Sequence, residues 1–252
     1  MGRLDDRVAV VTGAAQGIGA AYAKAMAAEG ASVIVADRDD GKKVVDQITA
    51  SGGKALNVVT DVSDETSCAA MTEQTLDAFG RIDILANNAA IFGHLETKPF
   101  EEISVDEWDS LMAVNVRGVF IAIKAVIGQM RKQQYGKIIN IASGTLFKGT
   151  PMLLHYVTSK GAVLAMTRCI SREVGDDNIC VNTLAPGLVM SENVLAGAAF
   201  SDTGVDANTE TRALKRRQLP EDLIGAMIYL ASSDSDFMTG QCMVVDGGSV
   251  NN

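Results

Sequence analysis

The chain has 252 residues, of which 47% are hydrophobic, and its formal net charge is −9 at pH 7. A chain of this size and apolar content can bury one large core, so we expect a single domain over residues 1–252. The acidic balance argues against nucleic acid or an anionic membrane as a main partner. No apolar run is long enough to span a membrane and no targeting leader is recognisable, which predicts a cytoplasmic protein.

Cysteine and histidine usage argues against a metal centre. The four cysteines, Cys68, Cys169, Cys180 and Cys242, are scattered without metal-ligand spacing, and the chain has only two histidines. We therefore expect free thiols, as in a reducing compartment, and no metal site.

The first predicted element is a buried strand at residues 8–11, followed by a glycine-rich turn and an amphipathic helix that runs to Gly30. The turn at residues 13–19 has the spacing Gly-x-x-x-Gly-x-Gly, which differs from the general Gly-x-Gly-x-x-Gly fingerprint. Glycines between a strand and a helix let the backbone approach a pyrophosphate, which the helix N-terminus then binds. A turn without a ligand is the alternative, but it would not require three glycines, which cost backbone entropy.

A second strand at residues 32–36 ends at Asp37, which lies 18 residues after Gly19. An acidic residue at about this offset accepts hydrogen bonds from the adenosine ribose of a dinucleotide. A carboxylate there would repel a 2′-phosphate, and the glycine turn holds no cation to offset the repulsion, so we expect NAD and not NADP. Arg38 weakens that inference, and a helix beginning near Asp40 gives Asp37 an alternative role as its cap.

The alternation of strands and helices continues through residue 142. It predicts parallel strands joined by right-handed crossovers, with a ligand beyond the carboxyl ends of the strands. Further strands are expected at 54–60, 82–86 and 137–142, and helices at 65–79 and 105–133. The residues expected at strand ends are polar, namely Asp37, Asp61, Asn87 and Ser143.

Tyr156 and Lys160 lie four residues apart, which places them on one face of a helix. A cation beside a phenol favours the phenolate and lowers the pKa of the tyrosine, which lets it exchange a proton with an alcohol or a carbonyl. Ser143 follows a predicted buried strand, where its hydroxyl could hold the same substrate oxygen. Taken alone, such a pair is more often an ordinary helix face.

Asn115 is an amide among apolar residues of the long predicted helix. If it is buried, its side chain must be hydrogen-bonded. It either satisfies a backbone group in the core, kinks the helix or binds a water, and the sequence favours none of these.

The ordered set of motifs resembles the short-chain dehydrogenase/reductase superfamily over essentially the whole chain. The motifs are Thr12-Gly13-x-x-x-Gly17-Ile18-Gly19, Asp61-Val62, Asn87-Asn88-Ala89, Asn115, Ser143, Tyr156-x-x-x-Lys160, Pro186-Gly187-x-Val189, Thr239-Gly240-Gln241 and Asp246-Gly247-Gly248. The resemblance implies an α/β fold of Rossmann type, in which helices flank a doubly wound sheet of seven parallel strands in a single domain. It also implies a homotetramer, assembled through the helices at 105–133 and 155–175 and the C-terminal strand.

The resemblance assigns a role to each catalytic residue. Tyr156 would be the general acid/base, and Lys160 would lower its pKa and hold the nicotinamide ribose. Ser143 would bind the substrate oxygen, and Asn115 would hold a water in a proton relay to Lys160.

The implied cofactor is NAD. The residues that would bind it are Gly13, Gln16, Gly17, Ile18, Gly19, Asp37, Asp61, Val62, Asn87, Ala89, Tyr156, Lys160, Pro186, Gly187, Val189 and Ser191. The chain departs from the family at Ala90, where glycine is usual, and at Ser191, where threonine is usual. Both changes are small, and Ser191 keeps a hydroxyl group, so neither puts the activity in doubt.

The expected activity is hydride transfer between NAD(H) and a small-molecule secondary alcohol or ketone with an apolar cyclic or aromatic substituent. Residues 190–219 mix apolar and polar side chains as a substrate lid would. The basic run in this segment, Arg212, Lys215, Arg216 and Arg217, is typical of a solvated helix face.

Two alternatives remain. A 3-oxoacyl-[acyl-carrier-protein] reductase usually takes NADPH and a basic docking patch; Asp37 and the net charge disfavour it, although Arg131, Lys132 and Arg172 could form a local patch. A non-catalytic NAD-binding regulatory module would have lost one of the catalytic residues, and all are present.

Overall fold

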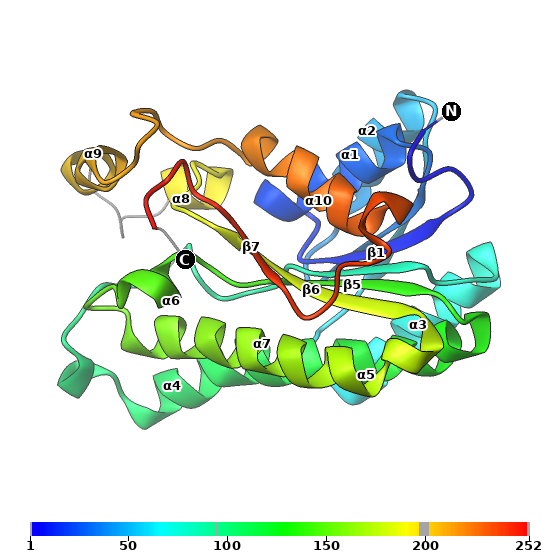
Figure 1. Cartoon of the computed structure of the whole chain (residues 1–252), viewed down its shortest axis with the longest axis horizontal. Helices are drawn as coiled ribbons and strands as arrows, with labels where there is room; N and C mark the ends of the chain where they lie inside the picture. The colour runs from blue at the N-terminus through cyan, green and yellow to red at the C-terminus, as the bar shows by residue number, and fades with distance from the viewer. Residues whose placement is uncertain (1, 94, 197–201, 251–252) are drawn as a thin grey trace.

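The structure is a computed structural model that describes residues 2–93, 95–196 and 202–250 (Figure 1). Within these residues, one sheet of seven strands has the order β3-β2-β1-β4-β5-β6-β7, and every pairing is parallel. The strands are β1 Val8–Thr12, β2 Ser32–Asp37, β3 Lys54–Val59, β4 Ile84–Asn87, β5 Gly136–Ile141, β6 Ile179–Pro186 and β7 Cys242–Val245. The predicted doubly wound parallel sheet is confirmed, and its order reverses between β1 and β4.

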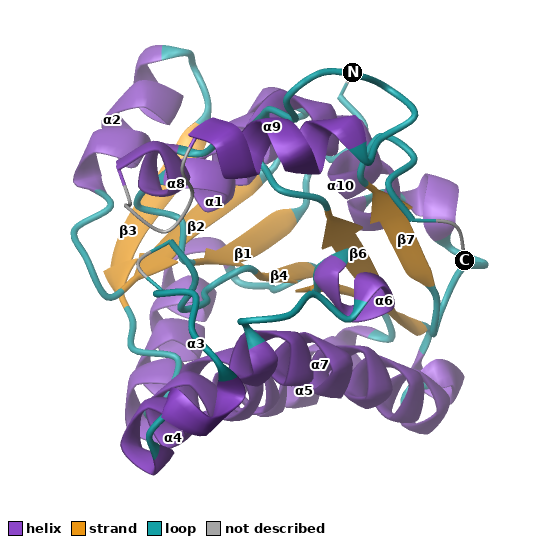
Figure 2. Cartoon of the chain, turned by 90° about the vertical axis from the view of Figure 1, so that its left-hand side faces the viewer, coloured by secondary structure: helices purple, strands orange, loops and turns teal. Residues whose placement is uncertain are grey.

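Helices cover both faces of the sheet (Figures 1 and 2). The described α-helices are α1 Gly17–Ala28, α2 Lys42–Ala50, α3 Glu65–Phe79, α4 Val105–Met112, α5 Val119–Gln133, α6 Thr145–Lys148, α7 Leu154–Glu173, α8 Glu192–Ala196, α9 Asp202–Glu210 and α10 Ile224–Ala231. Helices α1, α2 and α10 lie on one face, and α3, α5 and α7 lie on the other.

The buried strands carry apolar side chains toward both helical layers because successive residues of a strand point to opposite faces. Val11 packs in the cluster that contains Met26 of α1, whereas its neighbour Val10 packs in the cluster that contains Val126 of α5. This two-sided burial explains why β1 is a nearly uninterrupted apolar run. It also leaves the strand ends as the place where polar side chains can gather.

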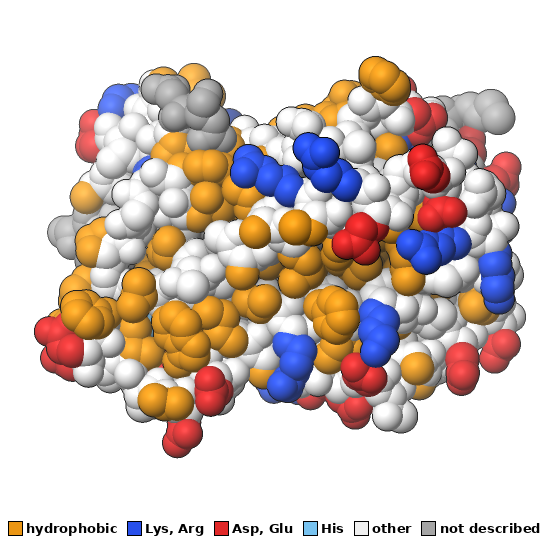
Figure 3. All heavy atoms as spheres, turned by 60° about the horizontal axis from the view of Figure 1, so that its bottom comes forward, with side chains coloured by type: hydrophobic (Ala, Val, Ile, Leu, Met, Phe, Trp, Pro, Cys, Tyr) orange, Lys and Arg blue, Asp and Glu red, His pale blue; other side chains and the backbone are white. Residues whose placement is uncertain are grey.

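The predicted long helix at 105–133 is continuous but not uniform. A π-helical segment, Ala113–Gly118, joins α4 to α5 and contains the buried Asn115. Of the alternatives left open for this residue, the structure shows both a distorted helix and an amide that satisfies a backbone group, because the side chain bonds to the N–H and the carbonyl of Ile91. By length and composition the stretch Val105–Gln133 would be able to cross a membrane. However, Ile121, Ala122 and Val126 are buried in the core beside the sheet, so it is a core helix of this fold. Figure 3 shows the face formed by α4, α5 and α7, where hydrophobic side chains gather.

Two expected boundaries move. The helix expected near Asp40 begins at Lys42, whose N–H donates to the Asp40 carboxylate at 2.9 Å. The role of Asp37 as a helix cap is therefore wrong. The strand expected at 82–86 is β4, Ile84–Asn87.

All four cysteines are free as predicted.

Candidate active site

A cavity of about 560 Å³ opens at the carboxyl ends of the strands, beside the point where the strand order reverses. Most of the predicted site residues line it, although they come from seven separate segments of the chain. These residues are Gly13, Gln16, Gly17, Ile18, Gly19, Asp37, Asp61, Val62, Ala89, Ser143, Tyr156, Lys160, Pro186, Gly187, Val189 and Ser191. Two predicted residues, Asn87 and Asn115, do not line the cavity.

The glycine turn after β1 has the conformation and the close contacts that only glycine permits. Gly13 has φ +65°, and a Cβ atom there would lie 2.8 Å from the Ala89 Cα. A Cβ atom on Gly19 would lie 2.1 Å from the Gly13 carbonyl oxygen. Gln16, the N-cap of α1, makes no side-chain capping hydrogen bond among the described residues, so its side chain does not satisfy the first N–H groups of the helix. The turn thus fits a pyrophosphate by both shape and charge.

Asn88 closes this turn, and sequence reasoning assigned it no separate role. Its Nδ2 donates to the carbonyl oxygens of Thr12 and Gly13, each at 3.0 Å, while its backbone N–H donates to the Thr12 hydroxyl at 3.1 Å. These bonds fix the end of β4 against the turn. The position of Asn88 directly after a predicted buried strand was the sequence feature that could have indicated this role.

Three carboxylates, Asp37, Asp39 and Asp61, line the cavity on the side of β2 and β3. Asp37 accepts hydrogen bonds from the N–H groups of Ala15 at 2.9 Å and Asp39 at 3.1 Å. Asp61 accepts from the backbone and hydroxyl of Ser63, and these bonds hold the pKa of Asp61 below its usual range. The bond from Ala15 therefore holds the Asp37 side chain against the glycine turn.

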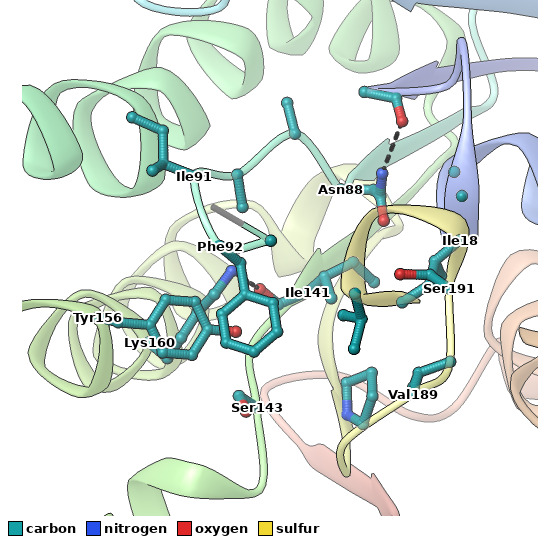
Figure 4. A pocket seen from close by; sticks show the side chains of 18 of the residues that line it. Ile18, Asn88, Ile91, Phe92, Ile141, Ser143, Tyr156, Lys160, Val189 and Ser191 are labelled. Carbon is teal, nitrogen blue, oxygen red and sulfur yellow. Dashed lines mark hydrogen bonds between the residues drawn. The ribbon is translucent and has the colours of Figure 1, made fainter. Parts of the chain in front are cut away.

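Tyr156, Lys160 and Ser143 converge in the cavity (Figure 4). Tyr156 and Lys160 lie one turn apart on α7, both are buried, and the Lys160 Nζ lies 5.6 Å from the centre of the tyrosine ring. The Lys160 Nζ donates to the Ile141 carbonyl at the end of β5, at 2.8 Å. Ser143 follows the same strand, and its Oγ accepts from the Thr145 hydroxyl at 3.0 Å. These contacts hold the three groups in one place.

The expected effect of Lys160 on Tyr156 is wrong for the structure as it stands. Burial raises the pKa of Tyr156 to about 12, and only the hydrogen bond with Ser143 acts to lower it. Burial also lowers the pKa of Lys160 to about 8. Removal from water disfavours both charged forms, and burial is the largest cause of both shifts.

The buried ammonium predicts a dependence of stability on pH. Because the pKa of Lys160 is about 8 in the folded chain and ordinarily 10.5, the unfolded chain binds more protons between these values. Stability therefore rises with pH over this window, and the group's contribution amounts to about 3 kcal/mol at most. Urea unfolding of the wild type and of Lys160→Met should be measured from pH 7.5 to 10.5. The unfolding free energy of the wild type minus that of the variant should rise with pH. A constant difference would contradict the low pKa.

The two asparagines outside the cavity hold the framework around it. The Asn87 Nδ2 donates to the Asn140 side chain on the neighbouring strand at 2.9 Å. The Asn115 Oδ1 accepts from the Ile91 N–H at 2.8 Å, and its Nδ2 donates to the Ser159 hydroxyl at 3.3 Å. Asn115 thus joins the π-helical segment to α7 and to the loop after β4.

Phe92, in that loop, connects Tyr156 to the segment expected to be the lid. Its ring centre lies 4.6 Å from that of Tyr156, and it also packs on the buried cluster of Met190, Val194 and Val205. Part of the lid segment, residues 197–201, lies outside the described residues. In the described part, α8 and α9 lie over the carboxyl edge of the sheet (Figure 2).

The basic run of the lid segment divides in two. Lys215, Arg216 and Arg217 form salt bridges with Glu210, Asp222 and Asp206, respectively, as expected of a solvated face. Arg212 is buried instead, and its Nη2 donates to the Leu188 carbonyl at 2.7 Å and the Asn208 Oδ1 at 3.1 Å. The interpretation as a solvated face is therefore wrong for Arg212.

Comparison with known proteins agrees with this geometry. The model of the family described as enoyl-(acyl carrier protein) reductase matches residues 13–250. The 2-dehydro-3-deoxy-D-gluconate 5-dehydrogenase of Dickeya dadantii is 36% identical over 246 residues, which cover 97% of this chain and 96% of that protein. The (2S)-[(R)-hydroxy(phenyl)methyl]succinyl-CoA dehydrogenase subunit BbsD of Thauera aromatica is also 36% identical, over 97% of each chain.

A solved structure agrees as well. It is described as an NAD(P)-dependent gluconate 5-dehydrogenase from Beutenbergia cavernae with NADP bound at low occupancy, and it superimposes with a TM-score of 0.90. The two chains are 36% identical, and the match covers 98% of this chain and 97% of that one. The family match over nearly the whole chain, together with the convergent tyrosine, lysine and serine, shows that the protein is an oxidoreductase of the short-chain dehydrogenase/reductase superfamily.

Proposed function

We propose that the protein is an NAD-dependent dehydrogenase that interconverts a secondary alcohol and a ketone. The observation that carries the proposal is the convergence of Ser143, Tyr156 and Lys160 in a cavity that also contains the glycine turn. A regulatory module that only bound the dinucleotide would not require all three of these groups. Fold alone would not justify the proposal, since many functions share it.

The residues present fit a dinucleotide along the cavity. The glycine turn and the N-terminus of α1 would bind the pyrophosphate, Asp37 the adenosine ribose, and Asp61 and Val62 the adenine. Lys160 would bind the nicotinamide ribose, next to Pro186, Gly187, Val189 and Ser191. When bound, the nicotinamide would accept or supply the hydride.

The protein's own contribution is proton transfer and positioning. Ser143 holds the substrate oxygen, and Tyr156 takes the hydroxyl proton during oxidation or returns it during reduction. The Lys160 ammonium, one turn away on α7, would stabilise the phenolate formed in that step and so oppose the rise that burial causes in the pKa of Tyr156. We also propose that Asn115 positions a water for proton relay to Lys160.

Asp37 supports a preference for NAD. Its carboxylate is fixed by Ala15 on the turn, where a 2′-phosphate would bring a second negative charge close to it. Repulsion between unit charges about 4 Å apart is about 1–4 kcal/mol near a protein surface. We therefore expect kcat/KM to be about tenfold or more higher with NAD than with NADP, and Asp37→Ser to remove most of that ratio.

A matched control is available two residues further on. Asp39 also lines the cavity, but its contact with Asp37 uses only its backbone N–H, so Asp39→Ser removes the same charge and leaves that contact intact. Its NAD/NADP ratio should stay close to that of the wild type. The B. cavernae neighbour was described with NADP bound, so a wild-type enzyme that prefers NADP is the result that would reverse this assignment.

The walls of the cavity near Tyr156 support a substrate with an apolar, cyclic or aromatic substituent. Phe92, Leu153 and Val194 line the cavity there, and residues 190–219 would close over it as a lid. The printed name of the T. aromatica relative places a hydroxyl group beside a phenyl group. A spectrophotometric screen of NAD reduction over aliphatic and aryl secondary alcohols should give the highest kcat/KM for the aryl compounds.

A second candidate, 3-oxoacyl-[acyl-carrier-protein] reductase, is favoured by the description of the matching family, which names acyl carrier protein. Asp37 opposes this candidate. Arg131 opposes it as well, because this member of the basic patch that could dock the carrier is paired with Asp177 at 3.1 Å. Reduction of an acetoacetyl thioester with NADPH tests it. Faster turnover there than with any alcohol would make this the function.

We also propose a cytoplasmic homotetramer. Val105, Phe120 and Leu154, on α4, α5 and α7, are 73%, 48% and 45% exposed, so these helices present apolar side chains to solvent (Figure 3). Burial of such a face against another copy would remove that area from water. Light scattering coupled to size-exclusion chromatography would report the mass of the assembly.

A further inference from the structure

Two cations that line the cavity, Lys148 and Arg38 beside Asp37, have no part in the proposed reaction. Lys148, the last residue of α6, lines the cavity together with Ser143 and Tyr156. Helix α6 begins two residues after Ser143, which follows β5, and β1 and β4 separate β5 from β2 in the sheet. Lys148 therefore lies toward the reacting groups and away from Asp37 and the adenosine end of the cavity.

Lys148 has no carboxylate partner among the described residues. Its Nζ donates to two neutral groups, the hydroxyl of Thr211 at 3.1 Å and the hydroxyl of Ser249. The three exposed cations of the nearby basic run all form salt bridges, as described above. Lys148 therefore brings a positive charge to the cavity wall that no ion pair neutralises.

The carboxylate of Asp246 also lines the cavity and attracts the Lys148 ammonium, but no hydrogen bond or salt bridge joins the two side chains among the described residues. The two oxygens of Asp246 accept the backbone N–H groups of Gly248, Ser249 and Val250, at 2.9–3.1 Å. The buried Arg212 adds a second positive charge that interacts with both Asp246 and Lys148. Two cations, Lys148 and Arg212, thus share the single carboxylate of Asp246, and of the two only Lys148 lines the cavity.

The neighbouring polar groups are suited to an acceptor. The Asn208 Oδ1 accepts from Arg212, and no hydrogen bond among the described residues uses its amide nitrogen, which is a donor. The hydroxyl-bearing residues Thr145 and Thr150 line the same part of the wall. An ionised carboxylate only accepts hydrogen bonds, and its bonds to charged donors are the stronger kind.

We propose that Lys148, with Asn208 beside it, forms a subsite for a carboxylate of the substrate. The substrate would then be a hydroxy acid or an oxo acid in which an apolar segment separates the reacting carbon from the carboxylate. One unpaired cation suits a monoanion better than a dianionic phosphate. This inference rests on the proposed dehydrogenase function and narrows its substrate class.

A matched pair of substrates tests the inference, namely 4-(1-hydroxyethyl)benzoate and its methyl ester. Wild-type kcat/KM should be higher for the acid than for the ester. Lys148→Met should lower kcat/KM for the acid by about 10- to 100-fold, the usual value of a hydrogen bond to a charged group, and change the value for the ester by less than about twofold. Lys148→Arg, which keeps the charge, should retain most of the preference for the acid.

Two controls separate the anion subsite from other effects. Lys215→Met removes a cation of the same segment that is already paired with Glu210, so it should leave the preference unchanged. Thr211→Val removes a hydroxyl partner of Lys148 and leaves the charge in place. If Lys148 only held the lid segment, Lys148→Met and Thr211→Val would reduce turnover of both substrates equally, and the inference would be overturned.

A binding measurement keeps the inference separate from the proposed reaction. Isothermal titration of 4-acetylbenzoate and its methyl ester, with NAD present so that no hydride can be delivered to the ketone, needs no turnover. A preference for the acid that disappears in Lys148→Met supports the subsite, whether or not an alcohol is oxidised. A failure to oxidise any alcohol would contradict only the proposed function. Equal binding of acid and ester by the wild type would reject the subsite.

Discussion

Replacement of Tyr156 by phenylalanine is expected to lower kcat by roughly 10²–10⁴-fold, the usual contribution of a positioned general acid or base, while NADH binding is retained. The phenol is the proposed acid/base group, and it lines the cavity together with Ser143 and Lys160. Phenylalanine keeps the ring that packs on Phe92, so the wall of the cavity should survive. Steady-state kinetics and fluorescence titration with NADH measure the two effects separately.

Tyr22 supplies the control for this substitution. It is fully buried in α1, and its hydroxyl finds no hydrogen-bond partner among the described residues. Tyr22→Phe therefore makes the same chemical change away from the cavity and removes an unsatisfied polar group, so activity and stability should be unchanged or slightly improved. Near-native kcat in Tyr156→Phe would mean that another group transfers the proton.

Replacement of Gly19 by alanine is expected to damage both the cofactor site and the fold. The new Cβ would lie 2.1 Å from the Gly13 carbonyl oxygen and 2.5 Å from the Asn88 Nδ2, and the first of these is a backbone atom. Relief of that clash requires the turn to open. We expect a loss of about 3 kcal/mol in unfolding free energy, the upper end of overpacking effects, and at least tenfold weaker NADH binding.

Gly128 provides the matched helical glycine. It lies in the exposed face of α5, and a Cβ atom there would meet nothing within 4 Å. Gly128→Ala should stabilise the protein by about 0.5–1 kcal/mol, because alanine loses less backbone entropy in a helix. Urea unfolding of both variants gives the comparison. If Gly19→Ala were as well tolerated as Gly128→Ala, the close packing of the glycine turn could not be correct.

Burial affects both the charge state and the position of Tyr156 and Lys160. Removal from water keeps the phenol neutral until the reaction, since its pKa is raised to about 12. Removal from water also lowers the pKa of Lys160 to about 8. The hydrogen bond from its Nζ to the Ile141 carbonyl holds the side chain in place whether or not it is protonated. Hydrogen bonding and packing therefore position the pair. Its charge state depends on the charge of the cofactor or substrate that enters the cavity.

Local sequence determined a large part of this protein. The apolar runs of β1 and β2 can be identified from the sequence because strands buried on both faces need apolar side chains on most residues. The glycine turn is identifiable because positive φ at Gly13 and the close contact at Gly19 exclude other residues. The spacing of Tyr156 and Lys160 is enough to place them on one face of α7, since helical periodicity is a local property.

Only the tertiary structure decided the rest. Asn87 faces Asn140 within the sheet while Asn88 closes the glycine turn, because the direction of a side chain at a strand end depends on its neighbours. The pKa of Tyr156 is raised because its desolvation depends on atoms from many segments, which no spacing along the chain reveals. Likewise, Lys148 reaches the cavity without a carboxylate partner because of how α6, the lid segment and the C-terminal turn pack together, which residue type and local pattern leave open.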